Sequence, residues 1–509
     1  MDYLDIEVKE DSILGKIKKS KFLWILLIII IIILILISVI IINLIKSNGK
    51  KHKDEKDIIL EKIKTNPLYH SQYLLNLFNY TTKLNLTNFN KNQKKLNQKI
   101  NKIIAEKEKN KNLYITLSTI YGAFLADSMG SFCEFLSQNK NNHLSIYEKE
   151  SEHIFKPGQV TDDSELAMSQ AFAIMDNLNY SSINPHLLYY YYVIWYHSAP
   201  KDIGTTTGYS LSLLDIQKTK ITDNIIFNDS IKKNIYNNKG NSLSNGFIMR
   251  ISPFLAWFYM MNKNYIKEVL DGNNNEKYFE LYNKIYFEIS KDNQITHPNE
   301  TQPIGASILL FMGLCSIQEN YTGKKVLEKV EILFQNNHFN KEENKYEKIF
   351  KERFHKLLLI YRDKEFDKFN FFSNVQDDIG NFNHAFNLTV YYLEIFDEKR
   401  KSMNLTEIYT NMIYDICDFG GDTDTNGAIA GMVIGGLVGM ENFEKKYFDI
   451  FLSFYEETRI IYTNTFMYFY VTFLEKISST KYKPNSNSPV SFGFIDMFLN
   501  MLYRDIDFV

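Results

Sequence analysis

The stretch "FGGDTDTNGAIAGMVIGGLVG", from Phe419 to Gly439, joins two neighbouring aspartates to a glycine-rich apolar segment. Four glycines recur at intervals of four residues along it, which places them on one side of a helix. Glycine costs about 1 kcal/mol in a helix interior, so four on one side need a reason. Close approach of a second helix is such a reason, whereas the apolar run is too short to cross a membrane. We therefore expect a central, buried helix. The glycines at its contact with the second helix are Gly427, Gly431, Gly435 and Gly439.

A second acidic stretch, "GQVTDDSELAMSQAFAIM" from Gly158, has the same order of a threonine, nearby aspartates and a helical pattern. Either stretch alone suits a helix N-terminus, where Thr and Asp are preferred caps and acids favour the dipole. Asp162 with Glu165 even fits a capping box. A cap needs one side-chain oxygen, however, and the two stretches together offer six residues with oxygens: Thr161, Asp162, Asp163, Asp422, Asp424 and Thr425.

So many oxygens close together cost several kcal/mol unless a cation neutralises them. Hard divalent ions such as Mg²⁺ bind oxygen ligands and often keep water molecules in their coordination sphere. If the two helix starts face each other, they form an oxygen cage for one or two such ions.

The composition bounds what the protein does. Of its 509 residues 45% are apolar and 15% aromatic, which is typical of a globular chain with a sizeable core. The formal net charge of −2 gives no reason to expect a nucleic-acid partner. Three cysteines, without a metal-binding spacing, indicate thiols in a reducing compartment. From about Leu113 apolar residues recur at three and four, so we predict an all-α domain.

The N-terminal part differs from the rest. Residues 22–45, "FLWILLIIIIIILILISVIIINLI", carry no charge and are long enough to cross a bilayer as a helix. A signal peptide would be shorter and end at a small-residue cleavage site, which is not visible here. We predict an N-terminal tail (1–21), a single transmembrane helix (22–45) in a lipid bilayer, and a Lys/Asn-rich tether (46–112). Lysines flank the apolar segment on both sides and leave its orientation undecided.

Six motifs occur in an order that resembles the ADP-ribosylglycohydrolase family, which is related to dinitrogenase-reductase-activating glycohydrolase and to ADP-ribosyl-arginine and ADP-ribosyl-serine hydrolases. The resemblance covers roughly residues 113–478, and we assign 113–505 to this domain, with an expanded segment at about 321–372. The motifs are "GAFLADSMGSFCEF" (from Gly122), "GQVTDDSELAM", "WYHSAPKDIGTTT" (from Trp195), "SNGFIMRISPF" (from Ser244), "ITHPNET" (from Ile295) and "GGDTDTNGAIAG".

The resemblance implies an all-α domain that binds two Mg²⁺ ions and cleaves the bond between ADP-ribose and a protein side chain. It implies water attack at the anomeric carbon, with an arginine linkage favoured and a serine linkage as the alternative. The substrate is then an ADP-ribosylated protein, and the usual compartment of such modifications favours the cytosol for the domain. The implied metal ligands are Thr161, Asp162, Asp163, Asp422, Asp424 and Thr425; the implied catalytic residues are Asp202, Glu134 and Asp163; the implied substrate-binding residues are Asn245, Gly246, His297 and Gly204.

Alternatives stay open for several of these residues. Glu134 also fits an ordinary surface acid, Asp202 a turn or helix cap, and His297 a structural histidine. Arg250 either contacts substrate or pairs with a carboxylate of the framework. At the level of the whole protein, the alternatives are a membrane-tethered protein that binds ADP-ribose without turnover and a purely structural membrane protein.

Overall fold

The computed structural model describes much of the chain from residue 102 onward, in several separate segments. The described residues are 102–109, 111–148, 155–176, 182–196, 200–212, 233, 242–272, 274–335, 339, 345–454 and 474. The chain divides into two compact units, Met1–Thr65 and Asn66–Val509, and every described residue belongs to the second. The predicted tail (1–21), the predicted transmembrane helix (22–45) and most of the tether (46–112) therefore lie outside the described residues. Among the helices that are described, none is both long and apolar enough to span a bilayer.

The described region is helical, as predicted, and its one β-like feature is an isolated antiparallel bridge between Ser244 and Asn381. The α-helices are α6 (Lys111–Gly130), α7 (Asp162–Asp176), α8 (Pro185–Tyr196), α9 (Thr205–Ser212), α11 (Ser252–Asp271), α12 (Asn275–Thr296), α13 (Thr301–Ser316), α14 (Gly323–Phe334), α15 (Lys345–Tyr361), α16 (Lys368–Phe371), α17 (Phe382–Lys399), α18 (Leu405–Phe419), α19 (Thr423–Val438) and α20 (Lys445–Ser453). Short 3₁₀ helices are η1 (Asn142–Ser145), η2 (Asn245–Arg250), η4 (Phe372–Gln376) and η5 (Met440–Asn442).

Helices α6 and α19 form the centre of the domain, where their backbones touch. A Cβ atom on Gly431 would lie 2.4 Å from the carbonyl oxygen of Gly122, and one on Gly435 would lie 2.9 Å from the Cα of Gly122. The predicted glycine contact is therefore confirmed for Gly427, Gly431 and Gly435. Gly439 differs, because it follows the helix and ends it with a φ of 80°, a left-handed conformation that suits glycine.

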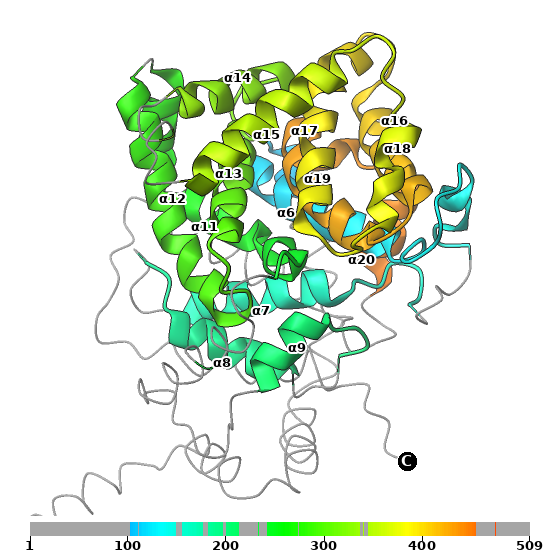
Figure 1. The fold of residues 1–509 in the computed structure, drawn as a ribbon, viewed down its shortest axis with the longest axis horizontal. Coiled ribbons are helices and arrows are strands. Elements are labelled where there is room, and N and C mark those ends of the chain that lie inside the picture. Colours follow the sequence, from blue (N-terminus) through cyan, green and yellow to red (C-terminus); the bar gives the residue numbers. More distant parts are fainter. Residues whose placement is uncertain are drawn as a thin grey trace, which may run out of the picture. The chain divides into compact units, whose positions relative to one another are not determined.

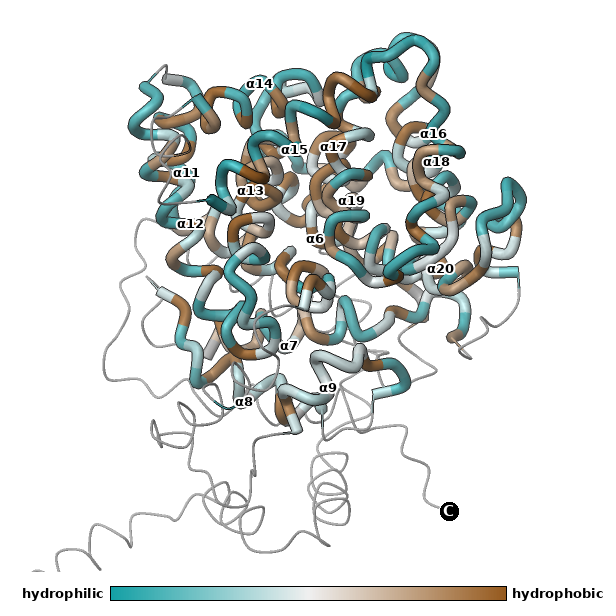
Figure 2. Tube along the Cα trace, in the orientation of Figure 1, coloured by the Kyte–Doolittle hydropathy of each residue, from teal (hydrophilic) through white to brown (hydrophobic). Residues whose placement is uncertain are grey.

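The other helices surround this pair. In the view of Figure 1, α11, α12 and α13 lie to its left, α16 and α18 to its right, and α7, α8 and α9 below it. Figure 2 shows hydrophobic residues along α13 and α17 and many hydrophilic residues at the periphery of the helices. Within the predicted expanded segment at 321–372, the described residues are largely helical, in α14, α15 and α16. Helices α14 and α15 both pack against α17.

The contact between α6 and α19 fixes the C-terminal end of α6 against the N-terminal end of α19. Thr423, the first residue of α19, donates from its hydroxyl to the carbonyl oxygen of Gly130, the last residue of α6, at 2.6 Å. A Cβ on Gly130 would lie 2.6 Å from the Cα of Asp424. The segment that leaves α6 and carries Glu134 therefore starts beside the acidic turn of α19.

Candidate functional site

The two acidic stretches meet in the structure. The hydroxyl of Thr425, in the first turn of α19, donates to Asp163 Oδ2 at 3.1 Å. The hydroxyl of Thr161, just before α7, lies 3.3 Å from the same oxygen. Asp162, Asp163 and Asp424 are all buried. The two helix starts therefore face each other, which was the condition for an oxygen-rich site.

Asp127, on α6, holds the start of α7. Its carboxylate accepts hydrogen bonds from the backbone N–H of Thr161 at 3.0 Å and from the Thr161 hydroxyl at 2.8 Å. It also accepts from the backbone N–H of Ser164 at 3.2 Å and from the Ser164 hydroxyl. The two backbone N–H groups are donors that a local cap would normally satisfy. Because Asp127 satisfies them from another helix, Asp162 and Asp163 are free of that role.

Asp422 occupies the N-cap position of α19, yet its side chain makes no capping hydrogen bond. Its Oδ2 instead accepts from the amide Nδ2 of Asn245 at 2.7 Å. The backbone N–H of Asn245 in turn donates to the carbonyl oxygen of Gly380 at 2.8 Å. The capping interpretation is therefore wrong for Asp422, whose carboxylate faces the side chain of Asn245.

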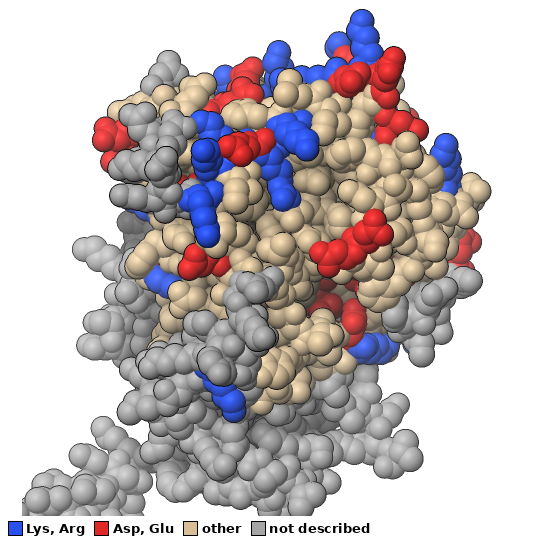
Figure 3. All heavy atoms as spheres, in the orientation of Figure 1, with Lys and Arg blue, Asp and Glu red and all other residues tan. Residues whose placement is uncertain are grey.

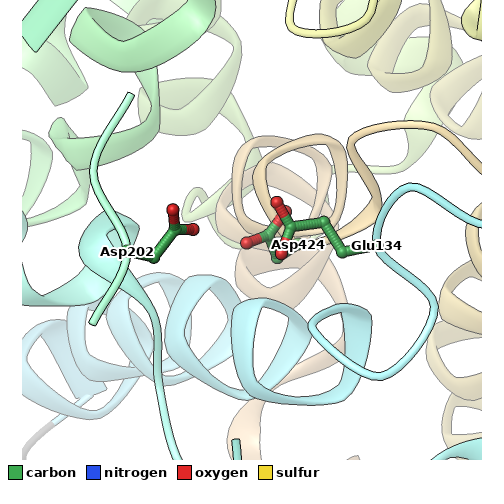
Figure 4. A group of neighbouring side chains, drawn as sticks. All are labelled: Glu134, Asp202 and Asp424. Carbon is green, nitrogen blue, oxygen red and sulfur yellow. The ribbon is translucent and has the colours of Figure 1, made fainter. Parts of the chain in front are cut away.

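Three carboxylates from distant parts of the chain converge beside this junction. One oxygen from each of Glu134, Asp202 and Asp424 lies within 4.8 Å of the others. Figure 4 shows Glu134 and Asp424 side by side, with the carboxylate of Asp202 directed toward them from its own segment. Glu134 is 4% exposed, so its interpretation as an ordinary surface acid is wrong. Asp202 is half-buried and lies in the segment that precedes α9.

Burial and mutual repulsion oppose ionisation of these acids. Burial, together with the negative charges of Asp422 and Asp202, raises the pKa of Glu134 to about 10. Burial also raises the pKa values of Asp163 and Asp424 well above the usual range, with neighbouring carboxylates adding to the effect. A nearby cation would reverse this shift, because it favours the charged form.

The side chains fit a divalent metal ion. Among the described residues, two buried carboxylate oxygens, Asp163 Oδ1 and Glu134 Oε2, have no hydrogen-bond partner. Buried polar atoms normally have a partner, so an unmatched pair of acceptors needs a cation or donor. Figure 3 shows Asp and Glu residues partly sunk between neutral residues near the middle of this face. An oxygen-only donor set of this kind suits Mg²⁺ or a similar hard ion.

The predicted substrate residues lie around the acids. The N–H of Gly204 donates to Asp162 Oδ2 at 3.4 Å. His297 is fully buried, and a Cβ on Gly246 would lie 3.1 Å from its Cε1 atom. Burial and the charge of Arg250 lower the pKa of His297 well below its usual value, which makes the ring neutral. Arg250 itself pairs with Asp292 at 2.9 Å, both fully buried, so it belongs to the framework.

The local sequence patterns predicted no role for Asp127, although the residue lies within the first family motif. Its signal was available, because it is the one charged residue in the apolar helical run "LYITLSTIYGAFLADSMG". Gly380 was also not assigned; a Cβ there would lie 3.4 Å from Asp422 Oδ2. That approach depends on how the loop before α17 folds back, and no local pattern shows it.

The chain is similar in sequence to proteins of one known family. The sequence profile of the ADP-ribosylglycohydrolase family matches residues 115–452. A protein of Acanthamoeba polyphaga mimivirus that carries the name ADP-ribosyl glycohydrolase is 29% identical over 338 residues, which cover 63% of this chain and 86% of the viral protein. A solved structure described as an ADP-ribosylglycohydrolase-related protein complex covers 77% of this chain and 98% of its own, with 14% identity and a TM-score of 0.42.

Proposed function

This chain belongs to the ADP-ribosylglycohydrolase family, and from that premise we propose that it removes ADP-ribose from modified protein side chains in a metal-dependent reaction. The observation that carries the proposal is the convergence of Glu134, Asp202 and Asp424 within 4.8 Å, beside the joined turns of α7 and α19. A protein that only bound nucleotide would have no evident need to bury so many acids together.

The proposed metal set consists of two Mg²⁺ ions. The unmatched oxygens of Asp163 and Glu134 support a cation at this place. Mg²⁺, when bound, supplies positive charge that orients the ribose hydroxyls and lowers the pKa of water. The residues that would hold the ions are Thr161, Asp162, Asp163, Asp422, Asp424 and Thr425, with Glu134 close enough to contribute.

The acids of the chain can move the protons that hydrolysis requires. Cleavage of a glycosidic bond needs one group that takes a proton from water and one that stabilises or protonates the leaving group. The side chain of Asp202 is only partly buried, so solvent reaches it. We therefore assign Asp202 the role of accepting the proton from the attacking water. Glu134 is buried beside Asp424, and we place it at the leaving group. Asp163 orients this arrangement through its hydrogen bond with Thr425.

The favoured linkage is that to arginine, and serine is the alternative. The sequence of the "WYHSAPKDIGTTT" and "SNGFIMRISPF" motifs supports arginine, whereas "GSFCEF" resembles the serine type. We further propose that the domain is tethered to a membrane through residues 22–45 and faces the cytosol. The charge-free sequence of that segment is the support for the tether.

The test is release of ADP-ribose by the full-length chain from proteins modified on arginine or on serine. Each reaction is run with Mg²⁺, with a chelator, and with the Asp424→Ala variant. Release from one linkage, lost with the chelator and in the variant, establishes the hydrolase and its linkage. A folded protein that binds ADP-ribose but releases none from either substrate would instead be an ADP-ribose-binding protein.

A further inference from the structure

Helix α15 turns one side toward the domain and the other side outward. On the inner side, Phe350 packs against Phe386 of α17, with 5.5 Å between the ring centres. The exposed residues of α15 follow one another at steps of three or four positions, with one adjacent pair, so they form a single stripe along the helix. This outward stripe consists of Lys345, Lys348, Ile349, Glu352, Lys356 and Leu359. It lies within the predicted expanded segment at 321–372, and none of its residues belongs to the acidic site.

The lysines of the outward stripe have no counter-charge. Among the described residues, no carboxylate forms a salt bridge with Lys345, Lys348 or Lys356. Lys345 instead lies 4.8 Å from the ring centre of Tyr346 on the same helix. Figure 3 shows Lys and Arg side chains gathered in the part of the face where Figure 1 places α15. Because the stripe contains a single acid, Glu352, it presents more positive than negative charge.

Two aliphatic side chains lie among these charges. Ile349 is 48% exposed and Leu359 is 75% exposed, and the second value is the largest among the exposed large hydrophobic residues that the structure describes. One exposed aliphatic residue is ordinary on a protein surface. Two of them on a stripe of unpaired lysines have the chemistry that a lipid surface binds. Apolar side chains enter the boundary between headgroups and acyl chains, while lysine stems follow them and the ammonium groups stay at anionic headgroups.

We propose that the outward stripe of α15 docks the domain on an anionic lipid bilayer. Ile349 and Leu359 enter the headgroup region, and the three lysines contact acidic headgroups. The stripe runs the length of the helix, about 21 Å at 1.5 Å per residue, so α15 lies parallel to the membrane surface. A nucleic acid is the other large polyanion, but its phosphates and bases favour arginine and aromatic side chains, and the stripe contains neither. This surface goes beyond the proposed hydrolase, and it depends neither on turnover nor on residues 22–45.

Fluorescence quenching on the full-length chain tests the proposal. A thiol-reactive fluorophore is attached at Ile349→Cys, which is selective because Cys133, Cys315 and Cys417 are buried. The vesicles contain phosphatidylcholine, with or without phosphatidylserine, and a lipid that carries a nitroxide quencher near its headgroup. We expect quenching only with phosphatidylserine, and its loss in about 1 M salt, where the Debye length is about 3 Å. The matched position, Phe287→Cys on α12, replaces another exposed large hydrophobic residue and should stay unquenched.

Substitutions in the labelled chain separate the contributions of charge and apolar contact. Replacing Lys345, Lys348 and Lys356 together by Gln should lower the ratio of quenched to unquenched label by roughly 100-fold, since each lysine contributes about fivefold at an anionic surface. Leu359→Ser should lower the same ratio by roughly tenfold. A control variant removes as much charge from exposed lysines that pair with acids on other parts of the surface, and it should change nothing: Lys267→Gln, Lys401→Gln and Lys445→Gln.

Flotation of the same vesicles distinguishes docking by α15 from attachment elsewhere. A chain that floats with both kinds of vesicle while the label at position 349 stays unquenched is attached by another segment, which overturns the proposal. Equal quenching with and without phosphatidylserine, or quenching that the triple lysine variant leaves unchanged, overturns it as well. A label that responds to duplex RNA and to neither kind of vesicle would identify a nucleic acid as the partner instead.

Discussion

The hydroxyl of Thr425 donates to Asp163 Oδ2 at 3.1 Å, although the two residues are 262 positions apart in the chain. This bond joins the first turn of α19 to the first turn of α7. The opposite oxygen of Asp163, Oδ1, has no hydrogen-bond partner within the part of the chain that the structure describes. One carboxylate oxygen is thus fixed by the protein, and the other is left for a ligand.

Loss of the hydrogen bond between Thr425 and Asp163 should lower the affinity for Mg²⁺ more than it lowers the stability of the fold. Thr425→Val keeps the side-chain shape but removes the hydroxyl, which is both a proposed metal ligand and the donor that orients Asp163. We expect about a 10- to 100-fold loss of Mg²⁺ affinity by calorimetry, the range found when groups that orient metal ligands are removed. Thr425→Ser keeps the hydroxyl and should restore most of it. Unchanged affinity in the valine variant would contradict both the ligand role and the orienting role of the Thr425 hydroxyl.

Mg²⁺ binding should release protons. Burial raises the pKa of Glu134 to about 10, so this acid holds its proton at neutral pH until a cation favours the charged form. Metal affinity should therefore rise with pH through the neutral range, as protons compete less. Titration in two buffers of different ionisation enthalpy counts the protons, and Glu134→Gln should release fewer.

The control for proton release is Glu347→Gln. Burial raises the pKa of Glu347 to about 7, but the residue lies on α15 and bonds to Tyr282. Its substitution should leave the metal-linked proton count unchanged. An equal decrease in both variants would mean that the released protons do not report on the acidic cluster.

The contact between α6 and α19 should not tolerate a methyl group. A Cβ on Gly431 would lie 2.4 Å from the carbonyl oxygen of Gly122, a backbone atom that cannot move aside alone. We expect Gly431→Ala to lower the free energy of unfolding by about 1–3 kcal/mol or more, measured by denaturant titration. Gly208→Ala, on α9, meets only ordinary contacts from 3.4 Å and should be neutral or stabilising by roughly 0.5–1 kcal/mol.

The buried ion pair between Arg250 and Asp292 should be costly to break. Both side chains are fully buried, so Asp292→Asn leaves the guanidinium without its counter-charge. We expect a loss of about 3–5 kcal/mol in thermal or chemical unfolding. Asp271→Asn, which breaks an exposed pair with Lys267 on α11, should change stability by less than about 1 kcal/mol. Similar small effects for both variants would contradict the assigned role of Arg250 in the framework.

The central helix and the oxygen-rich site could be predicted from the sequence because each depends on a local pattern of residues. The spacing of Gly427, Gly431 and Gly435 predicted a buried helix in close contact with another, since a helix places such residues on one side. The pattern of small, acidic and hydroxyl residues at two helix starts predicted an oxygen-rich site. The spacing did not show that Gly439 ends the helix, because an interval of four fits a last turn and the residue after it equally well.

What tertiary structure decided is which of these groups face one another. Asp127 satisfies the N–H groups of α7 only because α6 passes beside that helix start, and Glu134 is buried only because α6 ends against α19. The role of Arg250 depended on the approach of Asp292 from α12. A sequence specifies which groups can donate, accept or carry charge. Their partners, their burial and hence their pKa values arise only when distant segments are brought within a few ångströms.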